Sequence, residues 1–417
     1  MGQYAPWMQA MRTPSYPSDP ARGAYDVIIV GGAMMGAAAA WFLAENPDFD
    51  GTVLVVERDP SYERCSTAHS NSCLRQQFST ALNVRISQFC AEYIRDFRAQ
   101  MGGDPRVPEI DLHSFGYMYM AASETAADAL RAAHAVQAGC GAATRLMTPD
   151  QIADRYPFYA LGDIVLGSHN PVNEGYWDSG CVFDWWRRKA RERGVEFVSD
   201  EVAGLRLAPG GARVDGVTLA SGRGIGCGYL VNAAGPRAAR VARMAGIALP
   251  VEPRKRFTWV FSAARPLDRA LPLTVDPSGV HVRQDGPETY MAGAAPDPDP
   301  AVDPDDFAMD HALWQARVWP AIAARIPQFD ALRVVAEWAG HYAYNTLDRN
   351  AVTGPHPGIG NFLFMNGFSG HGLQQAPAMG RGIAEWVTNG GYRSLDLSPF
   401  HYDRILSGRA LAERAVI

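Results

Sequence analysis

The sequence predicts an α/β plus α+β protein, in which a Rossmann-like dinucleotide-binding domain is interleaved with a second domain built on an antiparallel sheet. Three observations lead to this fold class. A buried strand, a glycine-rich turn and a helix follow one another from Tyr25, and the next buried strand, residues 53–57, ends in an acid. Strand-like segments without helices between them gather in residues 255–294. A chain of 417 residues also exceeds one hydrophobic core, so we expect two domains.

The composition is that of an ordinary globular protein and excludes several classes of function. Hydrophobic residues make up 47% of the chain and charged residues 20%. The net charge of −6 and the dispersed arginines argue against a nucleic-acid partner. The six cysteines lack CxxC spacing and neighbouring histidines, so we expect reduced thiols and no metal site.

The opening residues, MGQYAPWMQAMRTPSYPSDPARG, have no basic start followed by an apolar core, as a secretory signal would. The most apolar run, VIIVGGAMMGAAAAWFLA, is broken by glycines and is not a transmembrane segment. The sequence therefore predicts a cytoplasmic protein. A peripheral contact at the inner membrane through Trp7, Met8 and Met11 is the alternative.

The glycine-rich turn carries the first functional signal. Gly31 permits the tight turn, the small Ala33 lets the backbone approach a pyrophosphate, and Gly36 lets the helix pack on the sheet. The N–H groups of Met34 and Met35 open the helix and face the phosphates. Ala33 replaces the usual middle glycine and adds a methyl group at the point of closest approach.

Glu57 ends the second strand about 20 residues after the last glycine, where a ribose hydroxyl is usually held. Its carboxylate, followed by Arg58, is compatible with NAD or FAD and repels the 2′-phosphate of NADP. The residues by themselves leave NAD and FAD open.

The remaining pattern gives the order of elements. Apolar spacing predicts a helix over 81–102, a strand over 113–122 and a helix that begins after Ser123. A further helix is expected over 310–326, after a Pro/Asp loop at 295–307. The resulting division is an N-terminal extension 1–24, a nucleotide-binding domain of 25–104, 173–249 and 341–405, a substrate domain of 105–172 and 250–340, and a C-terminal tail 406–417.

Four motifs carry a resemblance to a known family: VIIVGGAMMGAAAAWFLA with VLVVERD, STAHSNSCLRQQF, YLVNAAGPRA, and GPHPGIGNFLFMNGFSGHGLQQAPAMGRGIAEW. In this order, over about residues 25–405, the chain resembles the D-amino-acid oxidase superfamily, in its glycine and sarcosine oxidase and dimethylglycine dehydrogenase-like branch. GFSGHGLQQAP is the most specific piece. The resemblance implies FAD, bound between the nucleotide domain and an antiparallel substrate sheet. It also implies oxidation of a secondary, tertiary or N-methylated amino acid by hydride transfer to flavin N5, with hydrolysis of the imine product.

The resemblance assigns cofactor contacts along the whole chain. Beside the turn and Glu57–Arg58, the expected FAD contacts are Ser66, Thr67, His69, Val202, Ala233, Gly235, Gly367, Ser369, Gly370, His371, Gly372 and Leu373. The helix that begins at Gly372 would point its positive end at the flavin pyrimidine ring. His69 lies in an STxH stretch that dimethylglycine dehydrogenase-like enzymes use to attach flavin, so a covalent link at His69 is one alternative. His341, near the place where sarcosine oxidase uses a cysteine, is a second candidate anchor, and non-covalent FAD is the remaining alternative.

Substrate contacts are expected from Arg75, Gln374, His371, His281 and Tyr342. Gln374 stands where several oxidases keep a lysine for the substrate carboxylate, so the planar guanidinium of Arg75 is the first choice for that carboxylate. His371 either positions the loop or touches flavin or substrate. Tyr290, His341 and Tyr344 fall on the strands expected to cover the flavin, where such residues are also common in the core.

Met291 aligns with a lysine that promotes reaction with oxygen in sarcosine oxidase, which favours a dehydrogenase that passes electrons to a quinone or an electron-transfer flavoprotein over an oxidase. Two other classes of function stay open at this point. One is a flavoprotein that acts as an assembly or scaffold factor, since the branch includes a mitochondrial protein associated with respiratory complex I assembly. The other is an NAD enzyme, if the C-terminal motif were accidental.

Overall fold

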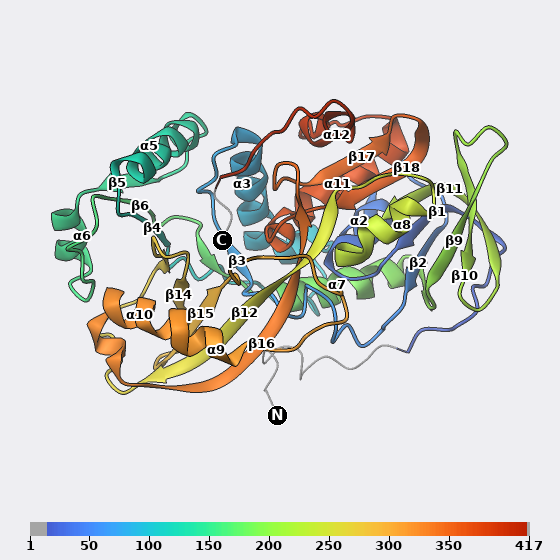
Figure 1. The fold of residues 1–417 in the computed structure, drawn as a ribbon. Coiled ribbons are helices and arrows are strands. Elements are labelled where there is room, and N and C mark those ends of the chain that lie inside the picture. Colours follow the sequence, from blue (N-terminus) through green and yellow to red (C-terminus); the bar gives the residue numbers. More distant parts are fainter. Residues whose placement is uncertain (1–14, 415–417) are drawn as a thin grey trace.

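The computed structural model describes residues 15–414, and it places two large sheets next to each other (Figure 1). The residues predicted to touch a membrane, Trp7, Met8 and Met11, lie outside the described residues. Within residues 15–414, every helix is too short or too polar to span a lipid bilayer.

The first sheet is the predicted nucleotide-binding sheet. Its central strands pair in parallel, and the apolar runs VIIV and VLVV are buried, as in a sheet covered on both faces. The strand order is β17 (Val352–His356), β18 (Ile359–Asn366), β11 (Gly224–Asn232), β1 (Ala24–Val30), β2 (Val53–Glu57) and β8 (Glu196–Ser199), with β10 (Val214–Leu219) and β9 (Val202–Leu207) added beside β11.

One face of this sheet is covered by a closely packed group of helices. The small residues of α2 allow this packing: a Cβ atom on Gly380 of α11 would lie 2.8 Å from the Cβ atom of Ala38 in α2. The group comprises α2 (Met34–Glu45), α3 (Ala81–Arg95), α7 (Ser179–Glu192) and α11 (Gly372–Asn389), whereas α8 (Ala238–Arg243) follows β11.

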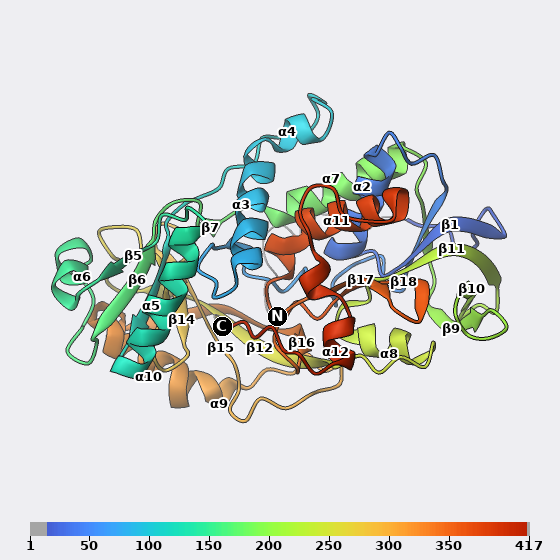
Figure 2. The same ribbon diagram turned by 90° about the horizontal axis from the view of Figure 1, so that it is seen from above.

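The second sheet is mainly antiparallel, as the sequence predicts. Its order is β16 (Leu332–Asn345), β12 (Val251–Ala263), β15 (Thr289–Ala294), β14 (His281–Gln284), β13 (Leu273–Val275), β4 (Tyr117–Ala121), β6 (Leu166–Asn170) and β5 (Arg145–Met147). α5 (Glu124–Gly139) lies against strands β4, β5 and β6 (Figure 2). The predicted domain boundaries stay predictions, although β16 continues the second sheet past residue 340.

Three predicted elements differ in extent. The helix expected over 81–102 is divided at Asp96 into α3 and α4 (Phe97–Gln100). The strand expected over 113–122 is shortened to β4, because Gly116 adopts a φ of +87° just before it. The helix expected over 310–326 is divided into α9 (His311–Leu313), a π-helical turn (Trp314–Val318) and α10 (Trp319–Arg325). Pro320 explains the last division, since proline has no N–H group to continue the helical hydrogen bonds.

The remaining elements are short: a two-stranded sheet of β3 (Cys73–Leu74) and β7 (Gly175–Tyr176), α6 (Pro149–Arg155), α12 (Asp403–Leu406) and 3₁₀ turns at Gly235–Arg237, Pro327–Asp330 and Ser398–Phe400. After α12 the chain returns toward α3 in the middle of the molecule (Figure 1). This return brings Glu413 next to residues of the cleft described below.

Candidate functional site

A cleft between the two sheets encloses about 2090 Å³, part of it open to solvent. Nearly all residues that the sequence singles out line it. They are Gly31, Ala33, Met34, Met35, Glu57, Arg58, Ser66, Thr67, His69, Arg75, Val202, Ala233, Gly235, His281, Tyr342, Ser369, Gly370, His371, Gly372, Leu373 and Gln374. Gly36 and Gly367 lie behind the wall. Their predicted importance is therefore one of backbone shape rather than of direct contact.

The glycine-rich turn leaves no room for larger residues at two positions. A Cβ atom on Gly36 would lie 1.8 Å from the carbonyl oxygen of Gly31, and one on Gly31 would lie 2.7 Å from that of Ala233. Gly31 also has a φ of +93°. The hydroxyl oxygen of Thr67 accepts the N–H of Met34 at 3.2 Å, so the loop after β2 is fixed to the start of α2.

Glu57 lies at the end of β2 with its carboxylate buried against the turn. It accepts the N–H groups of Gly32 and Asp59, each at 2.8 Å. Burial raises the pKa of this carboxyl, and the two backbone donors oppose that shift. A carboxylate in this place can accept further hydrogen bonds from the hydroxyls of a ribose.

This end of the cleft, the nucleotide end, carries mixed charge. Arg58 lies 3.5 Å from Asp305, which also pairs with Arg237, and Arg240 lies 3.1 Å from Glu201. All acidic residues among the described lining residues belong to this end: Glu57, Asp59, Asp200, Glu201 and Asp305. The arginines Arg58, Arg237 and Arg240 that line this end already have acidic partners.

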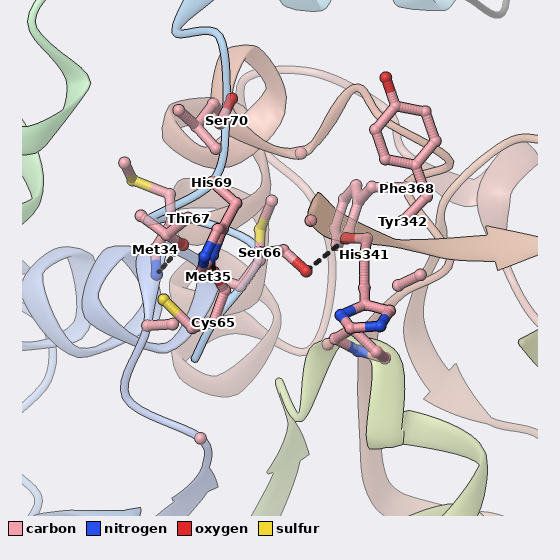
Figure 3. A pocket seen from close by; sticks show the side chains of 18 of the residues that line it. Met34, Met35, Cys65, Ser66, Thr67, His69, Ser70, His341, Tyr342 and Phe368 are labelled. Atoms are coloured by element: carbon pink, nitrogen blue, oxygen red, sulfur yellow. Dashed lines mark hydrogen bonds between the residues drawn. The ribbon is translucent and has the colours of Figure 1, made fainter. Parts of the chain in front are cut away.

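The polar run at residues 65–79 forms the wall that leads from the nucleotide end to the opposite end. Ser66 donates its hydroxyl proton to the carbonyl oxygen of His341 at 2.6 Å. The His69 Nδ1 lies 3.0 Å from the carbonyl oxygen of Cys65 and must donate to it, so Nε2 carries the lone pair in the neutral ring. Figure 3 shows Ser66 pointing toward His341, with the rings of His69 and His341 on opposite sides of it in this view.

The turn before α11 is shaped by glycine and by a tyrosine. Gly370 has a φ of +94°, and a Cβ atom there would lie 2.4 Å from the ring of Tyr342. Ser369 adopts a φ of +48°, and its hydroxyl accepts the N–H of Asn345 at 3.0 Å. The first residues of α11, Gly372 to Gln374, line the cleft directly after this turn, so the N-terminus of the helix lies at the cleft wall.

Arg75 lies at the other end of the cleft, the substrate end, and is 5% exposed. Its backbone N–H donates to Gln374 Oε1 at 2.8 Å, and its Nη2 donates to His371 Nε2 at 3.0 Å. The guanidinium lies over the ring of Phe78, 4.5 Å from the ring centroid. Because His371 Nε2 accepts this bond, the proton of the neutral ring is on Nδ1, and both His371 and Gln374 hold Arg75 in place.

Two buried carboxylates flank the segment that carries Arg75, and the sequence does not reveal either of them. Glu174 accepts the N–H of Gln76 at 2.6 Å and amide hydrogens of Gln77 and Asn170. Glu413, from the returning C-terminal chain, accepts the N–H and the hydroxyl of Ser79. Both lie near enough to Arg75 for their charges to interact. Only the tertiary fold brings residues 174 and 413 together with residue 75.

The other side chains that line the substrate end form a wall that is uncharged or cationic. His281 Nε2 accepts the side-chain amide of Asn71 at 3.3 Å, and burial together with the nearby arginines lowers its pKa to about 4. Tyr342, Tyr117, Thr258 and Arg256 complete this wall. Among the described lining residues, no Asp or Glu faces the substrate end.

Tyr290 and Tyr344, weighed as substrate contacts, do not line the cleft. Tyr290 is fully buried in the core on the other side of the second sheet, where its hydroxyl accepts the N–H of Leu267. Arg254 lies over the ring of Tyr344 instead. Met291 is buried beside Arg283, whose Nη2 is 3.4 Å from the Met291 sulfur.

Comparison with known proteins agrees with this geometry. Residues 26–386 match the family model for FAD-dependent oxidoreductases of the DAO family. FAD-dependent oxidoreductase domain-containing protein 1 of Xenopus laevis is 36% identical over 94% of this chain and 85% of its own length. L-Proline dehydrogenase from P. horikoshii has a TM-score of 0.79 at 24% identity, covering 94% and 100% of the two chains. Glycine oxidase from Geobacillus kaustophilus has a TM-score of 0.75 at 19% identity, covering 91% and 98%.

The residues at the nucleotide end fit FAD. The turn admits no side chain at Gly31 or Gly36, the helix α2 opens toward the cleft, and the Glu57 carboxylate is fixed by backbone donors. At the other end, α11 opens toward the place expected for the flavin ring. The chain belongs to the DAO family of FAD-dependent oxidoreductases, and FAD is its cofactor.

Proposed function

We propose that this oxidoreductase oxidises the C–N bond of a secondary, tertiary or N-methylated amino acid. The observation that carries the proposal is Arg75, a buried residue whose backbone is held by Gln374 and whose guanidinium donates to His371, at the end of the cleft where no acidic side chain lines the wall. A buried cation of this kind binds a carboxylate in a forked geometry. FAD, when bound, supplies the chemistry by accepting a hydride from the carbon next to nitrogen.

The residues of the chain have separate tasks in this proposal. Arg75 binds the substrate carboxylate and thereby fixes which carbon faces the flavin. Gln374, without a charge of its own, holds the Arg75 backbone. The first N–H groups of α11 stabilise negative charge that develops on the cofactor.

This wall, which has no acidic side chain, favours the amine in its neutral form, which is the form that can give up a hydride. With a pKa of about 4, His281 is neutral at physiological pH, and no acidic residue in the lining of this end stabilises an ammonium group. His281 and Tyr342 are the candidates for hydrogen bonding to the amine nitrogen. The ammonium form of the amine then gives its proton to water as it leaves solvent for the cleft, and the hydride is transferred from the neutral amine.

For the electron acceptor, we propose a quinone or an electron-transfer flavoprotein rather than oxygen. Support comes from Met291, which stands where the oxygen-activating lysine of sarcosine oxidase aligns. Met291→Lys should speed reoxidation of the reduced flavin by dissolved oxygen, measured by stopped-flow absorbance. An unchanged rate would count against this assignment of the position.

For FAD attachment at His69, the ring geometry is suitable because Nδ1–H is bonded to Cys65 and Nε2 carries the lone pair. Acid precipitation of the native protein and of His69→Ala separates the two alternatives. Flavin that stays with the precipitated native protein but not with the variant indicates a covalent link at His69. Flavin released from both indicates non-covalent FAD.

The experiment that tests the proposed function is an anaerobic screen of sarcosine, dimethylglycine, other N-methyl amino acids, proline and pipecolate. Bleaching of the flavin absorbance by at least one of them is expected. If no amine bleaches the flavin, a flavoprotein with an assembly or scaffold role becomes the better account.

A further inference from the structure

The loop at residues 297–308, between β15 and α9, crosses from the second sheet to the nucleotide end of the cleft. Figure 2 shows it running from β15 to the neighbourhood of α8 before it returns to α9. The N–H of Val302 donates to the carbonyl oxygen of Pro253 at 2.9 Å, which places the loop beside the first residues of β12, before its pairing with β15 begins at Phe257. We call residues 297–308 the strap.

Acidic side chains of the strap bind basic groups on both sides of the cleft. On the second sheet, both carboxylate oxygens of Asp299 lie 2.9 Å from Arg256, and Asp306 lies 2.7 Å from Lys255. On the first sheet, Asp305 pairs with Arg58 and with Arg237. These arginines follow β2 and β11, where the cofactor site lies.

An aromatic residue of the strap reaches the cleft wall next to the aspartates. The ring of Phe307 lies 5.1 Å from that of His69 and 4.5 Å, edge to face, from that of His341. On another side, His69 lies close to Gly340 of β16: a Cβ atom on Gly340 would approach the His69 Cβ to 2.7 Å. Phe307 and β16 together restrict the orientation of the His69 ring.

We propose that the strap is an additional part of the FAD site: Asp305 holds it across the bound cofactor, and Phe307 positions His69. FAD then leaves the protein only when the contacts of Asp305 with Arg58 and Arg237 open. These ion pairs are partly exposed, so salt screens them and speeds the release of FAD. The part of this proposal that concerns His69 rests on the proposed function, in which His69 contacts the flavin. The part that concerns the retention of FAD does not.

The test measures the rate at which FAD dissociates into excess apoprotein scavenger, followed by flavin fluorescence at low and at high NaCl. His69→Ala serves as the background so that no covalent link masks dissociation. In the His69→Ala background, Asp305→Asn should speed the release of FAD about three- to tenfold at low salt, the range expected for partly exposed ion pairs. High salt should reduce the difference between background and variant.

Asp297→Asn is the matched control. It removes the same charge from the same strap, but Asp297 is exposed and forms no ion pair within residues 15–414. Release at the background rate is expected for this control. Asp306→Asn, which breaks the Lys255 pair, provides a second variant if Asp305→Asn does not fold, with a smaller acceleration expected.

Equal release rates for the background, Asp305→Asn and Asp306→Asn at every salt concentration would overturn the proposal. So would equal acceleration by Asp297→Asn, since the effect would then be one of net charge alone. Failure of the amine screen would leave these rates interpretable, because they do not depend on turnover.

Discussion

The two ends of the cleft are suited to their ligands by different structural means. At the nucleotide end, backbone shape determines what can bind: Gly31 and Gly36 exclude side chains, and the arginines Arg58 and Arg240 are partly exposed and already paired with acids. At the substrate end, Gln374 and His371 hold the buried cation Arg75, and Glu174 and Glu413 fix the segment that follows it. Local sequence therefore encodes the cofactor site, whereas tertiary structure builds the substrate site.

The largest expected effect tests the role of backbone shape at the nucleotide end. Gly36→Val places a side chain where even a Cβ atom would lie 1.8 Å from the Gly31 carbonyl oxygen, so the turn and α2 cannot keep their packing. The purified variant should lack flavin absorbance or fail to fold. Gly139→Ala is the control, because no atom lies within 4 Å of a Cβ there, and it should retain flavin.

The next largest effect tests the role of the Arg75 side chain at the substrate end. Arg75→Met should weaken binding of a carboxylate ligand, measured by titrating the flavin spectrum with acetate or benzoate, by about 30- to 1000-fold. It should also lower the thermal stability, since the buried Glu413 carboxylate loses a cation with which its charge interacts. Flavin content should stay at the native level.

Arg265→Met is a matched control for that variant. Arg265 is exposed and pairs with Asp330 at the surface, so both ligand affinity and stability should remain near those of the native protein. Loss of flavin from Arg75→Met with unchanged ligand affinity in the remaining holoprotein would contradict the division into two ends.

A smaller effect concerns pH. Burial raises the pKa of Glu174 to about 8, although three hydrogen-bond donors oppose the shift. The folded protein then keeps a proton that the unfolded chain has lost between an ordinary carboxyl pKa and pH 8, so stability from this group falls as pH rises through that window. Relative to Glu174→Gln, the native protein should lose thermal stability between pH 6 and pH 8.5.

The comparison for Glu174 uses differences in melting temperature between the two proteins, which cancel the titration of groups that they share. A difference that stays constant over the range would mean that Glu174 is ionised throughout. The electrostatic account of the substrate end would then need revision, with the carboxylate pairing Arg75 at all these pH values.

The same contrast between local backbone shape and long-range contacts explains how much of each end could be predicted from the sequence. The βαβ turn, Glu57 and the GFSGHG turn were recognisable because spacing along the chain alone sets their geometry, and the cleft does contain them. Arg75 was identified within a polar run, but Glu174 and Glu413, which hydrogen-bond to its neighbours Gln76 and Ser79, lie about 100 and more than 300 residues away along the chain. No local pattern marks them, and the strap residues Asp305 and Phe307 were read only as a loop.

Secondary structure shows the same limit. The alternation in 113–122 and the apolar period in 310–326 predicted the right kind of element, but Gly116 and Pro320 changed their extent. Tyr290 lay on the predicted strand yet points into the core on the far face. Which face of a strand lines a site depends on the sheet that packs against it, and period alone does not show this.

The central claim is that Arg75 recognises the carboxylate of an amine substrate. The direct test is anaerobic bleaching of the flavin by sarcosine and proline, compared with dimethylamine and pyrrolidine, which lack only the carboxylate, in the native protein and in Arg75→Met. Bleaching of the native flavin by at least one amino acid, with little or none by its decarboxylated counterpart or in Arg75→Met, is the predicted result. Equal bleaching by both kinds of amine, or native rates in Arg75→Met, would contradict the claim.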